Sequence, residues 1–119
     1  MYTVQGNIRR GKQRGKDLGF PTANIPLAQN IPEGVYLSKV TIDNKDYPAL
    51  TFIGKAETFG ESEYQAESYI LDFDQIIYDQ QISVKLFKKI RDSKKFDSQE
   101  ELIEQMKEDE KEARKYFNL

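Results

Sequence analysis

Two residue types that often carry chemistry are absent from this chain of 119 residues. It contains no cysteine, which excludes disulfides and thiolate metal sites, and it contains no histidine. Without histidine, the commonest general base near neutral pH and the commonest zinc ligand are both missing. Any acid–base chemistry must therefore be carried by Asp, Glu, Lys or Tyr.

Long apolar runs are also absent. No segment approaches the ~20 apolar residues that a membrane-spanning helix needs. The N-terminus lacks the apolar core of a secretory signal. We therefore expect a cytoplasmic protein with no membrane partner. The length fits a single domain, residues 1–119, built around one hydrophobic core.

The charges are unevenly distributed although the net charge is only −2. That small value gives no overall field favouring nucleic acid or a membrane. Basic residues crowd into residues 9–16, and acidic residues concentrate between Asp97 and Glu112. The basic segment suits an anionic ligand, and the acidic segment suits a solvated helix. Plain solvent exposure explains both segments equally well.

Alternating and β-branched patterns predict strands over most of the chain. The predicted strands cover residues 3–10, 35–43, 47–53, 65–73 and 81–90. Gly-rich and polar composition predicts loops over 11–19 and 54–63, and residues 43–46 predict a hairpin connection between two of these strands. Ser98 and Glu101 then form a capping box, and apolar residues recur at helical spacing over 99–117. Strands followed by one helix indicate an antiparallel β-barrel with a helix packed against it.

Thr22 and Asn24 are candidates for a metal and phosphate site. They lie two apart in a segment that Pro21 and Pro26 hold extended, so they point the same way. Their neutral oxygens suit Mg²⁺, which takes few protein ligands and completes its shell with phosphates and water. Lys16 and nearby glycines could contact a phosphate, although no P-loop motif is present. An ordinary strand end and a flexible loop explain these residues as well.

Two later places in the chain offer the remaining candidates. Glu67 stands among apolar and aromatic residues of a strand, and burying an unpaired carboxylate is costly. It must face solvent or a cavity, where a partly desolvated Glu is a credible general base. Arg91, Lys94 and Phe96 offer cationic and aromatic contacts to a planar ligand. Glu67 could equally be a solvent-facing strand residue, and Phe96 could simply pack the helix start onto the core.

Taken in order, these segments resemble the riboflavin kinase family. Residues 14–25 (Arg-Gly-Lys-Asp-Leu-Gly-Phe-Pro-Thr-Ala-Asn-Ile) look like that family's phosphate loop and its Pro-Thr-Ala-Asn signature. Residues 67–73 are similar to the strand that carries its catalytic glutamate. The further matches are residues 34–36, 53–54, 58–59, 90–91, 95–96 and the helix containing Asp109. They follow the family's order over nearly the whole chain, which is more specific than any single match.

The resemblance implies a mainly β fold, a six-stranded antiparallel Greek-key barrel with one C-terminal α-helix. It implies an ATP-dependent riboflavin kinase that transfers the γ-phosphoryl of ATP to the 5′-hydroxyl of riboflavin, giving FMN and ADP. The implied site consists of Glu67 as catalytic base; Thr22 and Asn24 as ligands of Mg²⁺; Gly11, Lys16, Thr22, Ile70, Asp72 and Tyr78 at ATP; and Arg91, Lys94 and Phe96 at the flavin. We expect a monomer that binds no nucleic acid.

The chain departs from the family pattern at a few positions. Phe52 replaces an Asn that usually precedes the Ile-Gly pair, and Glu57 replaces a usual Pro. Tyr69 stands where His is frequent, Asp79 replaces a common Gly, and Lys16 stands where Arg is frequent. Phe52 and Glu57 share a neighbourhood, so flavin fit or rate is the property that these departures would alter.

Two alternative functions remain open. One is a flavin- or nucleotide-binding module without turnover, although the intact set of Thr22, Asn24 and Glu67 favours an enzyme. The other is a small barrel that binds nucleic acid through residues 9–16, although no aromatic residues alternate with the basic ones for base stacking.

Bacterial relatives often carry an FMN adenylyltransferase domain whose signature uses histidines, and this chain has no histidine. We therefore expect no FAD synthesis from this chain, whether it is free-standing or an excised kinase domain.

Overall fold

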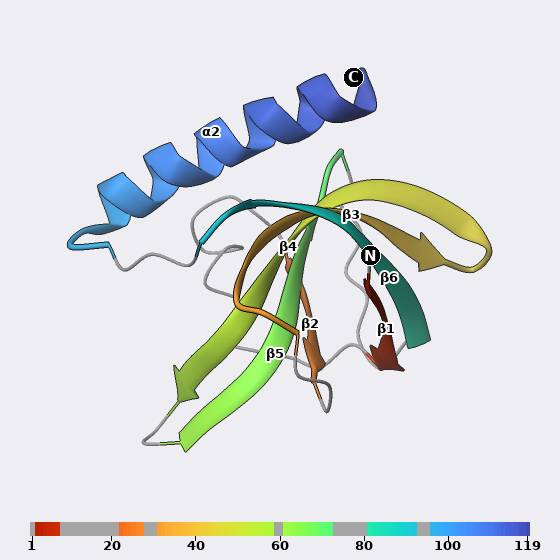
Figure 1. Ribbon diagram of the computed structural model, residues 1–119, viewed down its shortest axis with the longest axis horizontal. Coiled ribbons are helices and arrows are strands. Elements are labelled where there is room, and N and C mark those ends of the chain that lie inside the picture. The colour runs from red at the N-terminus through yellow and green to blue at the C-terminus, as the bar shows by residue number, and fades with distance from the viewer. Residues whose placement is uncertain (1, 8–21, 28–30, 59–60, 73–80, 93–95) are drawn as a thin grey trace.

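The computed structural model describes residues 2–7, 22–27, 31–58, 61–72, 81–92 and 96–119. The elements are β1 (Tyr2–Asn7), β2 (Thr22–Pro26), β3 (Gly34–Ile42), β4 (Lys45–Thr58), β5 (Glu61–Ile70), β6 (Gln81–Arg91) and α2 (Gln99–Phe117). One antiparallel sheet holds the strands in the order β1-β6-β3-β4-β5-β2. The sheet curls into a half-barrel, and α2 lies across its outer face (Figure 1).

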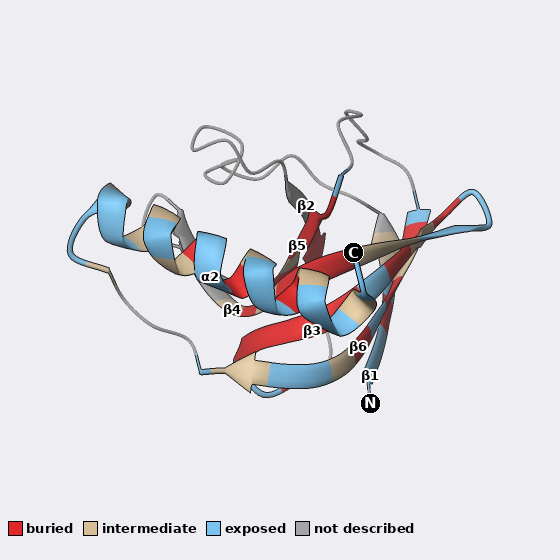
Figure 2. Ribbon diagram, turned by 90° about the horizontal axis from the view of Figure 1, so that it is seen from above, coloured by how far each residue is buried: buried red, intermediate tan, exposed pale blue. Residues whose placement is uncertain are grey.

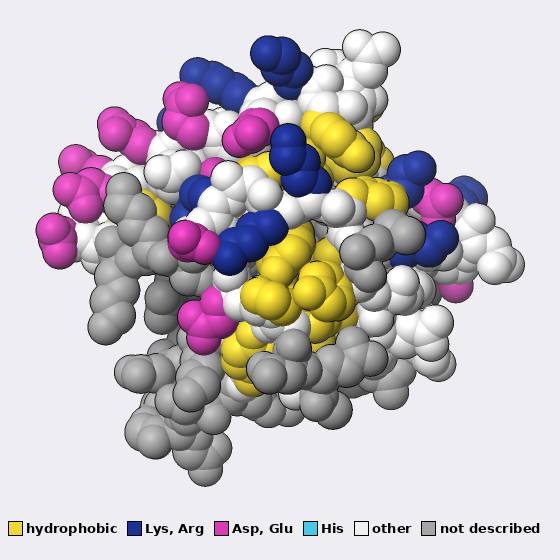
Figure 3. Space-filling view, in the orientation of Figure 1, with side chains coloured by type: hydrophobic (Ala, Val, Ile, Leu, Met, Phe, Trp, Pro, Cys, Tyr) yellow, Lys and Arg dark blue, Asp and Glu magenta, His cyan; other side chains and the backbone are white. Residues whose placement is uncertain are grey.

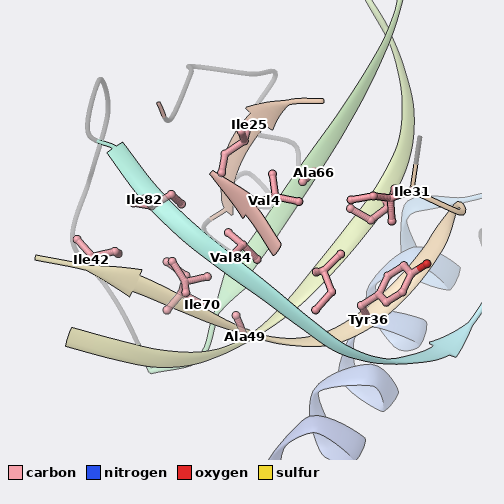
Figure 4. Packing of buried hydrophobic residues seen from close by; sticks show 13 residues of the cluster. Val4, Ile25, Ile31, Tyr36, Ile42, Ala49, Ala66, Ile70, Ile82 and Val84 are labelled. Atoms are coloured by element: carbon pink, nitrogen blue, oxygen red, sulfur yellow. The ribbon is translucent and has the colours of Figure 1, made fainter. Parts of the chain in front are cut away.

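The concave face of the sheet forms the main core. Thirteen buried residues from all the strands and the approach to β3, including Val4, Ile25 and Val84, pack together there (Figure 4). The two edge strands of the sheet, β1 and β2, come close to each other. A Cβ added to Gly6 of β1 would lie only 2.7 Å from Ile25 Cγ2 of β2. The curled sheet therefore encloses its own core on this side.

A second apolar cluster lies on the convex face, beneath α2. Val35, Leu37 and Leu50 of the sheet pack with Met106 and Ala113 of the helix. Figure 2 shows buried residues along the strands and on the side of the helix that faces them. The cluster explains why the helix stays on the sheet, since its other faces are polar and exposed.

The helix begins and ends where the sequence pattern predicts. The Ser98 side chain accepts a hydrogen bond from the Glu101 backbone N–H at 3.2 Å, which satisfies one of the free amides of the first turn. Asn118 adopts a left-handed conformation, with φ of 61°, and ends the helix. The mainly β class, the antiparallel sheet and a C-terminal helix are therefore confirmed.

The hairpin formed by β4 and β5 is longer than predicted. The prediction of a loop over residues 54–63 is wrong for most of that range. The backbones of β4 and β5 pair without a break from the pair Gly54 and Gln65 to the pair Thr58 and Glu61. Long-range pairing stabilises strands here although the polar composition carries no alternating signal. At its other end β5 stops at Ile70, short of the predicted Phe73, and Asp72 follows with φ of 55°.

The hairpin between β3 and β4 agrees better with prediction. Asp43 and Asn44 both have positive φ, 49° and 66°, as a two-residue hairpin turn of this kind requires. Asn and Asp tolerate that conformation better than other non-glycine residues do. In the described part of the chain, no helix combines the length and the apolar character that crossing a bilayer would require.

Candidate functional site

A row of cross-strand neighbours crosses the sheet and joins three of the predicted site residues. The register pairs Asn24 with Glu67, Glu67 with Phe52, Phe52 with Val35, and Val35 with Arg91. Directly opposed residues of antiparallel strands occupy the same face of a sheet. Val35 and Phe52 belong to the cluster beneath the helix, so the row lies on the convex face.

The predicted metal pair lies at one end of this row. Thr22 pairs with Tyr69 and Asn24 pairs with Glu67, so strand β2 brings both residues beside the predicted base. Among the described residues, no group of three or more Asp, Glu, His or Cys side chains is placed to hold a metal ion. A metal at this place would take few protein oxygens and complete its shell from phosphates and water. Mg²⁺ binds in that way, and the donors fit it.

Strand β5 separates Glu67 from the barrel interior. Its buried residues Ala66 and Ile70 contribute to the core on the concave face. Glu67 is half-buried and alternates with them, so it lies on the opposite face. Ile70, a predicted ATP-binding residue, has its side chain in the core, so a contact with a nucleotide there would come from its backbone.

Arg91 lies at the other end of the row and is held by the helix. Its Nε donates to Asp109 Oδ1 at 2.9 Å, and its Nη2 donates to Asp109 Oδ2 at 2.8 Å. Gln105 Nε2 also donates to Asp109 Oδ1, at 3.1 Å. The Arg91 Cζ atom lies 6.0 Å from the centre of the Phe96 ring. The structure therefore brings together Arg91 and Phe96, two of the three residues predicted at the flavin.

Asp72, predicted at ATP, takes part in a network that joins the end of β5 to α2. Arg114 Nη2 donates to Asp72 Oδ1 at 2.7 Å, and Arg114 Nε donates to Glu110 Oε2 at 3.2 Å. These hydrogen bonds from Arg114 lower the pKa of Asp72. Tyr69 donates to Glu110 Oε1 at 2.7 Å. Burial, followed by that hydrogen bond, raises the pKa of Tyr69 above its ordinary value.

Four predicted site residues cannot be placed. Gly11, Lys16, Tyr78 and Lys94 lie outside the described residues.

On the surface of the described part, acidic side chains gather around the first half of α2, and apolar side chains are visible below the helix (Figure 3). The acidic character predicted for this segment therefore belongs to a solvated helix.

Sequence reasoning did not assign a role to Asp109. It is almost fully buried, with 2% of its side chain exposed, and it is the partner that fixes Arg91. A signal was present, because Asp109 stands three residues after Met106 and four before Ala113 on the apolar side of the helix. A charged residue at such a position needs a buried partner.

The fold and site define a small β domain whose outer face carries a row of cross-strand neighbours, polar at both ends and apolar in the middle, where α2 packs. The family model described as riboflavin kinase matches residues 1–117. This chain belongs to the riboflavin kinase family.

Curated relatives agree with that placement. The chain is 42% identical over 120 residues to a protein named "Trifunctional protein RibF/MnmA" from Mycoplasmoides gallisepticum, covering 98% of this chain and 18% of that protein. It is 35% identical over 123 residues to the bifunctional riboflavin kinase/FMN adenylyltransferase of Bacillus subtilis, covering 98% of this chain and 39% of the relative. The chain thus spans well under half the length of these relatives.

Two solved structures share the fold. One is titled as a macrolide-efflux protein from Streptococcus pneumoniae, with a TM-score of 0.84 and 38% identity, and it covers 94% of this chain and 38% of that chain. The other is a riboflavin kinase from Trypanosoma brucei, with a TM-score of 0.66 and 23% identity, covering 98% of this chain and 79% of that chain. At that identity, the second likeness concerns the fold alone.

Proposed function

We propose that this chain is an ATP-dependent riboflavin kinase, which transfers the γ-phosphoryl of ATP to the 5′-hydroxyl of riboflavin and releases FMN and ADP. The observation that carries the proposal is the row from Asn24 through Glu67 to Arg91 on one face of the sheet. It supports the proposal because Asn24, the proposed metal ligand, and Glu67, the proposed general base, are directly opposed at one end. A cation and an aromatic ring lie at the other end.

The length of the row suits an elongated substrate. Glu67 and Arg91 are three strand spacings apart in the sheet order. At about 4.8 Å per spacing, they are separated by roughly 14 Å along the sheet. A flavin with its ribityl chain extended would place the terminal hydroxyl at Glu67 and the ring near Arg91 and Phe96. Phe52, which is only partly buried, would lie between them, whereas Val35 is buried beneath the helix.

In this arrangement Glu67 accepts the proton of the 5′-hydroxyl of riboflavin. The 5′-oxygen forms a bond to the γ-phosphorus of ATP, and the bond between that phosphorus and the oxygen bridging it to the β-phosphate breaks. Thr22 and Asn24 would hold Mg²⁺, which supplies neutralising charge to the phosphates when bound. Lys16 and Gly11 would contact the phosphates, and Ile70, Asp72 and Tyr78 would lie along the nucleotide. Arg91, Lys94 and Phe96 would cover the flavin. Phosphoryl transfer needs chiefly such positioning and charge neutralisation.

We further propose that residues 1–119 form one domain, a closed six-stranded Greek-key barrel, which acts as a cytoplasmic monomer without nucleic-acid or membrane partners. The close approach of Gly6 to Ile25, from strands at opposite ends of the sheet order, supports closure. A closed barrel also leaves no unpaired edge for association with other chains.

Glu67→Gln tests the proposed chemistry. The amide keeps the shape of the side chain but cannot accept the proton, so we expect riboflavin binding to persist while turnover falls about 10²–10⁴-fold. FMN formation would be followed by chromatography, and binding by quenching of riboflavin fluorescence. Glu104→Gln, at an exposed position of the helix, is the matched control and should retain full turnover. Undiminished turnover in Glu67→Gln would remove Glu67 from its assigned role.

One observation favours a second candidate, a flavin- or nucleotide-binding module without turnover. Phe52, a departure from the family pattern, lies directly opposite Glu67 in the register. If it prevents catalysis, the unaltered chain binds riboflavin but forms no FMN, and Phe52→Asn restores formation. FMN formation by the unaltered chain rejects this candidate.

A further inference from the structure

We propose that Asp109 is a positioning residue of this site, which fixes the guanidinium of Arg91 from the helix so that Arg91 meets the flavin in one orientation. The inference rests on the proposed function, since the ligand of Arg91 is taken to be riboflavin. It assigns a part in binding to helix α2, on which none of the predicted site residues lies.

The geometry of the pair shows that Asp109 determines how Arg91 is oriented. Both carboxylate oxygens accept hydrogen bonds from Arg91, from Nη2 at 2.8 Å and from Nε at 2.9 and 3.2 Å. A forked contact between a planar guanidinium and a carboxylate sets both the position and the plane of the arginine. Gln105 holds the same carboxylate at 3.1 Å from one turn earlier on the helix.

Two further contacts involve the guanidinium of Arg91. Its Nη1 donates to the Asp92 carbonyl oxygen at 3.2 Å, and its Cζ lies 6.0 Å from the centre of the Phe96 ring. The Arg91 side chain keeps 18% of its surface exposed, whereas Asp109 keeps 2%. The carboxylate itself is therefore shielded from a ligand, and it acts through the arginine. Ordering a long side chain before binding reduces the entropy lost when the ligand arrives.

The competing explanation is that the pair merely fastens the helix to the sheet. The chain already has a separate polar contact that does this, in which Arg114 bridges Glu110 and Asp72. That network lies at the end of β5 and includes no member of the row. It provides a matched control at Glu110, which accepts hydrogen bonds from Tyr69 of the sheet and from Arg114 of the helix, while Arg91 is left intact.

The test compares Asp109→Asn with Glu110→Gln in the full chain, below the melting temperature of both variants. Kinetics would give kcat and KM for riboflavin and for ATP, and fluorescence quenching would give the Kd for riboflavin. For Asp109→Asn we expect KM and Kd for riboflavin to rise about tenfold, with KM for ATP changed less than about twofold. Glu110→Gln should leave all three within about twofold of the unaltered chain.

A double variant tests whether Asp109 acts through Arg91. Adding Asp109→Asn to Arg91→Lys should raise the riboflavin KM no further, because the fork is already lost in Arg91→Lys. Independent, multiplying effects would contradict the proposal. If Asp109→Asn does not fold, Gln105→Met removes one contact to the carboxylate while keeping its ion pair. It should raise the riboflavin KM about threefold, and an unchanged KM would contradict the proposal.

Failure of this inference can be separated from failure of the proposed function. If the unaltered chain forms FMN and Asp109→Asn has unchanged KM and Kd for riboflavin, only the inference is overturned. A lowered melting temperature with unchanged kinetics likewise overturns the inference alone, because it leaves Asp109 only a part in docking the helix. If the unaltered chain neither binds riboflavin nor forms FMN, both are overturned.

Discussion

Replacing Thr51 by Val probes a chain of three hydroxyl groups buried in the barrel. Thr51 Oγ1 lies 2.7 Å from Ser38 Oγ and 2.9 Å from Ser68 Oγ, and none of the three residues has exposed surface. The hydroxyls connect β3, β4 and β5, and Ser68 is the neighbour of Glu67 on β5. Valine has nearly the same shape as threonine, so the substitution removes the hydrogen bonds and changes the packing little.

The expected cost follows from what the two serines lose. A buried hydroxyl left without a partner costs about 1–3 kcal/mol. Two serines are affected, and each can partly recover by turning toward a backbone carbonyl, which places the total at about 2–4 kcal/mol. With a urea m-value of about 1.5 kcal/mol per molar for a domain of this size, the midpoint of unfolding should fall by about 1.3–2.7 M.

The control removes the whole chain of hydroxyls. The triple variant Ser38→Ala/Thr51→Val/Ser68→Ala leaves none of these three positions with a buried hydroxyl that lacks a hydrogen-bond partner. Replacing all partners of a hydrogen bond by apolar groups is nearly neutral for stability. The triple variant should therefore lose at least about 1 kcal/mol less than the sum of the three single variants. A cost below about 0.5 kcal/mol for Thr51→Val, or strict additivity in the triple variant, would refute the reasoning.

Three further predictions concern stability. Burial raises the pKa of Tyr69 in the folded state, so the stability that the neutral side chain contributes is present below about pH 10 and is lost as the pH rises further. Tyr69→Phe should therefore reduce the fall in melting temperature between about pH 9 and 11, and an equal fall in the variant and the unaltered chain would contradict this. Gly34→Ala should cost about 2 kcal/mol or more by urea unfolding, because φ is 152° and the new Cβ would lie 2.8 Å from the Arg91 carbonyl oxygen; an unchanged midpoint would contradict this. Ser98→Ala should cost about 1 kcal/mol by the same measurement while Ser98→Asn, which still caps the helix, costs little, and equal losses would contradict the capping role.

Local signals were sufficient for the helix and for one hairpin. Ser98 and Glu101, with the apolar spacing that follows, predicted residues 99–117, and the structure has the helix over Gln99–Phe117. The hairpin signal around Asp43 and Asn44 was also local, because the turn depends on the conformations that these two residues accept. In both cases, the information lay within a few residues of the feature.

Features that depend on distant partners were not predictable in this way. The continuation of β4 to Thr58 depends on pairing with β5, and its polar residues give no periodic signal. The ion pair between Asp72 and Arg114, which lies 42 residues further along the chain, has no local signal either. Glu67 and Asn24 were named from sequence, and the register places them opposite each other, while their roles stay a prediction.

The proposed riboflavin kinase activity is measured by incubating the unaltered chain with riboflavin, ATP and Mg²⁺ and separating the flavins by chromatography. We expect riboflavin to be converted to FMN with release of one ADP per FMN. We also expect the reaction to stop when the metal is removed by a chelator and to resume when Mg²⁺ is restored. Riboflavin that remains unconverted across Mg²⁺, Mn²⁺ and Zn²⁺, in a chain shown to be folded, would contradict the proposed activity.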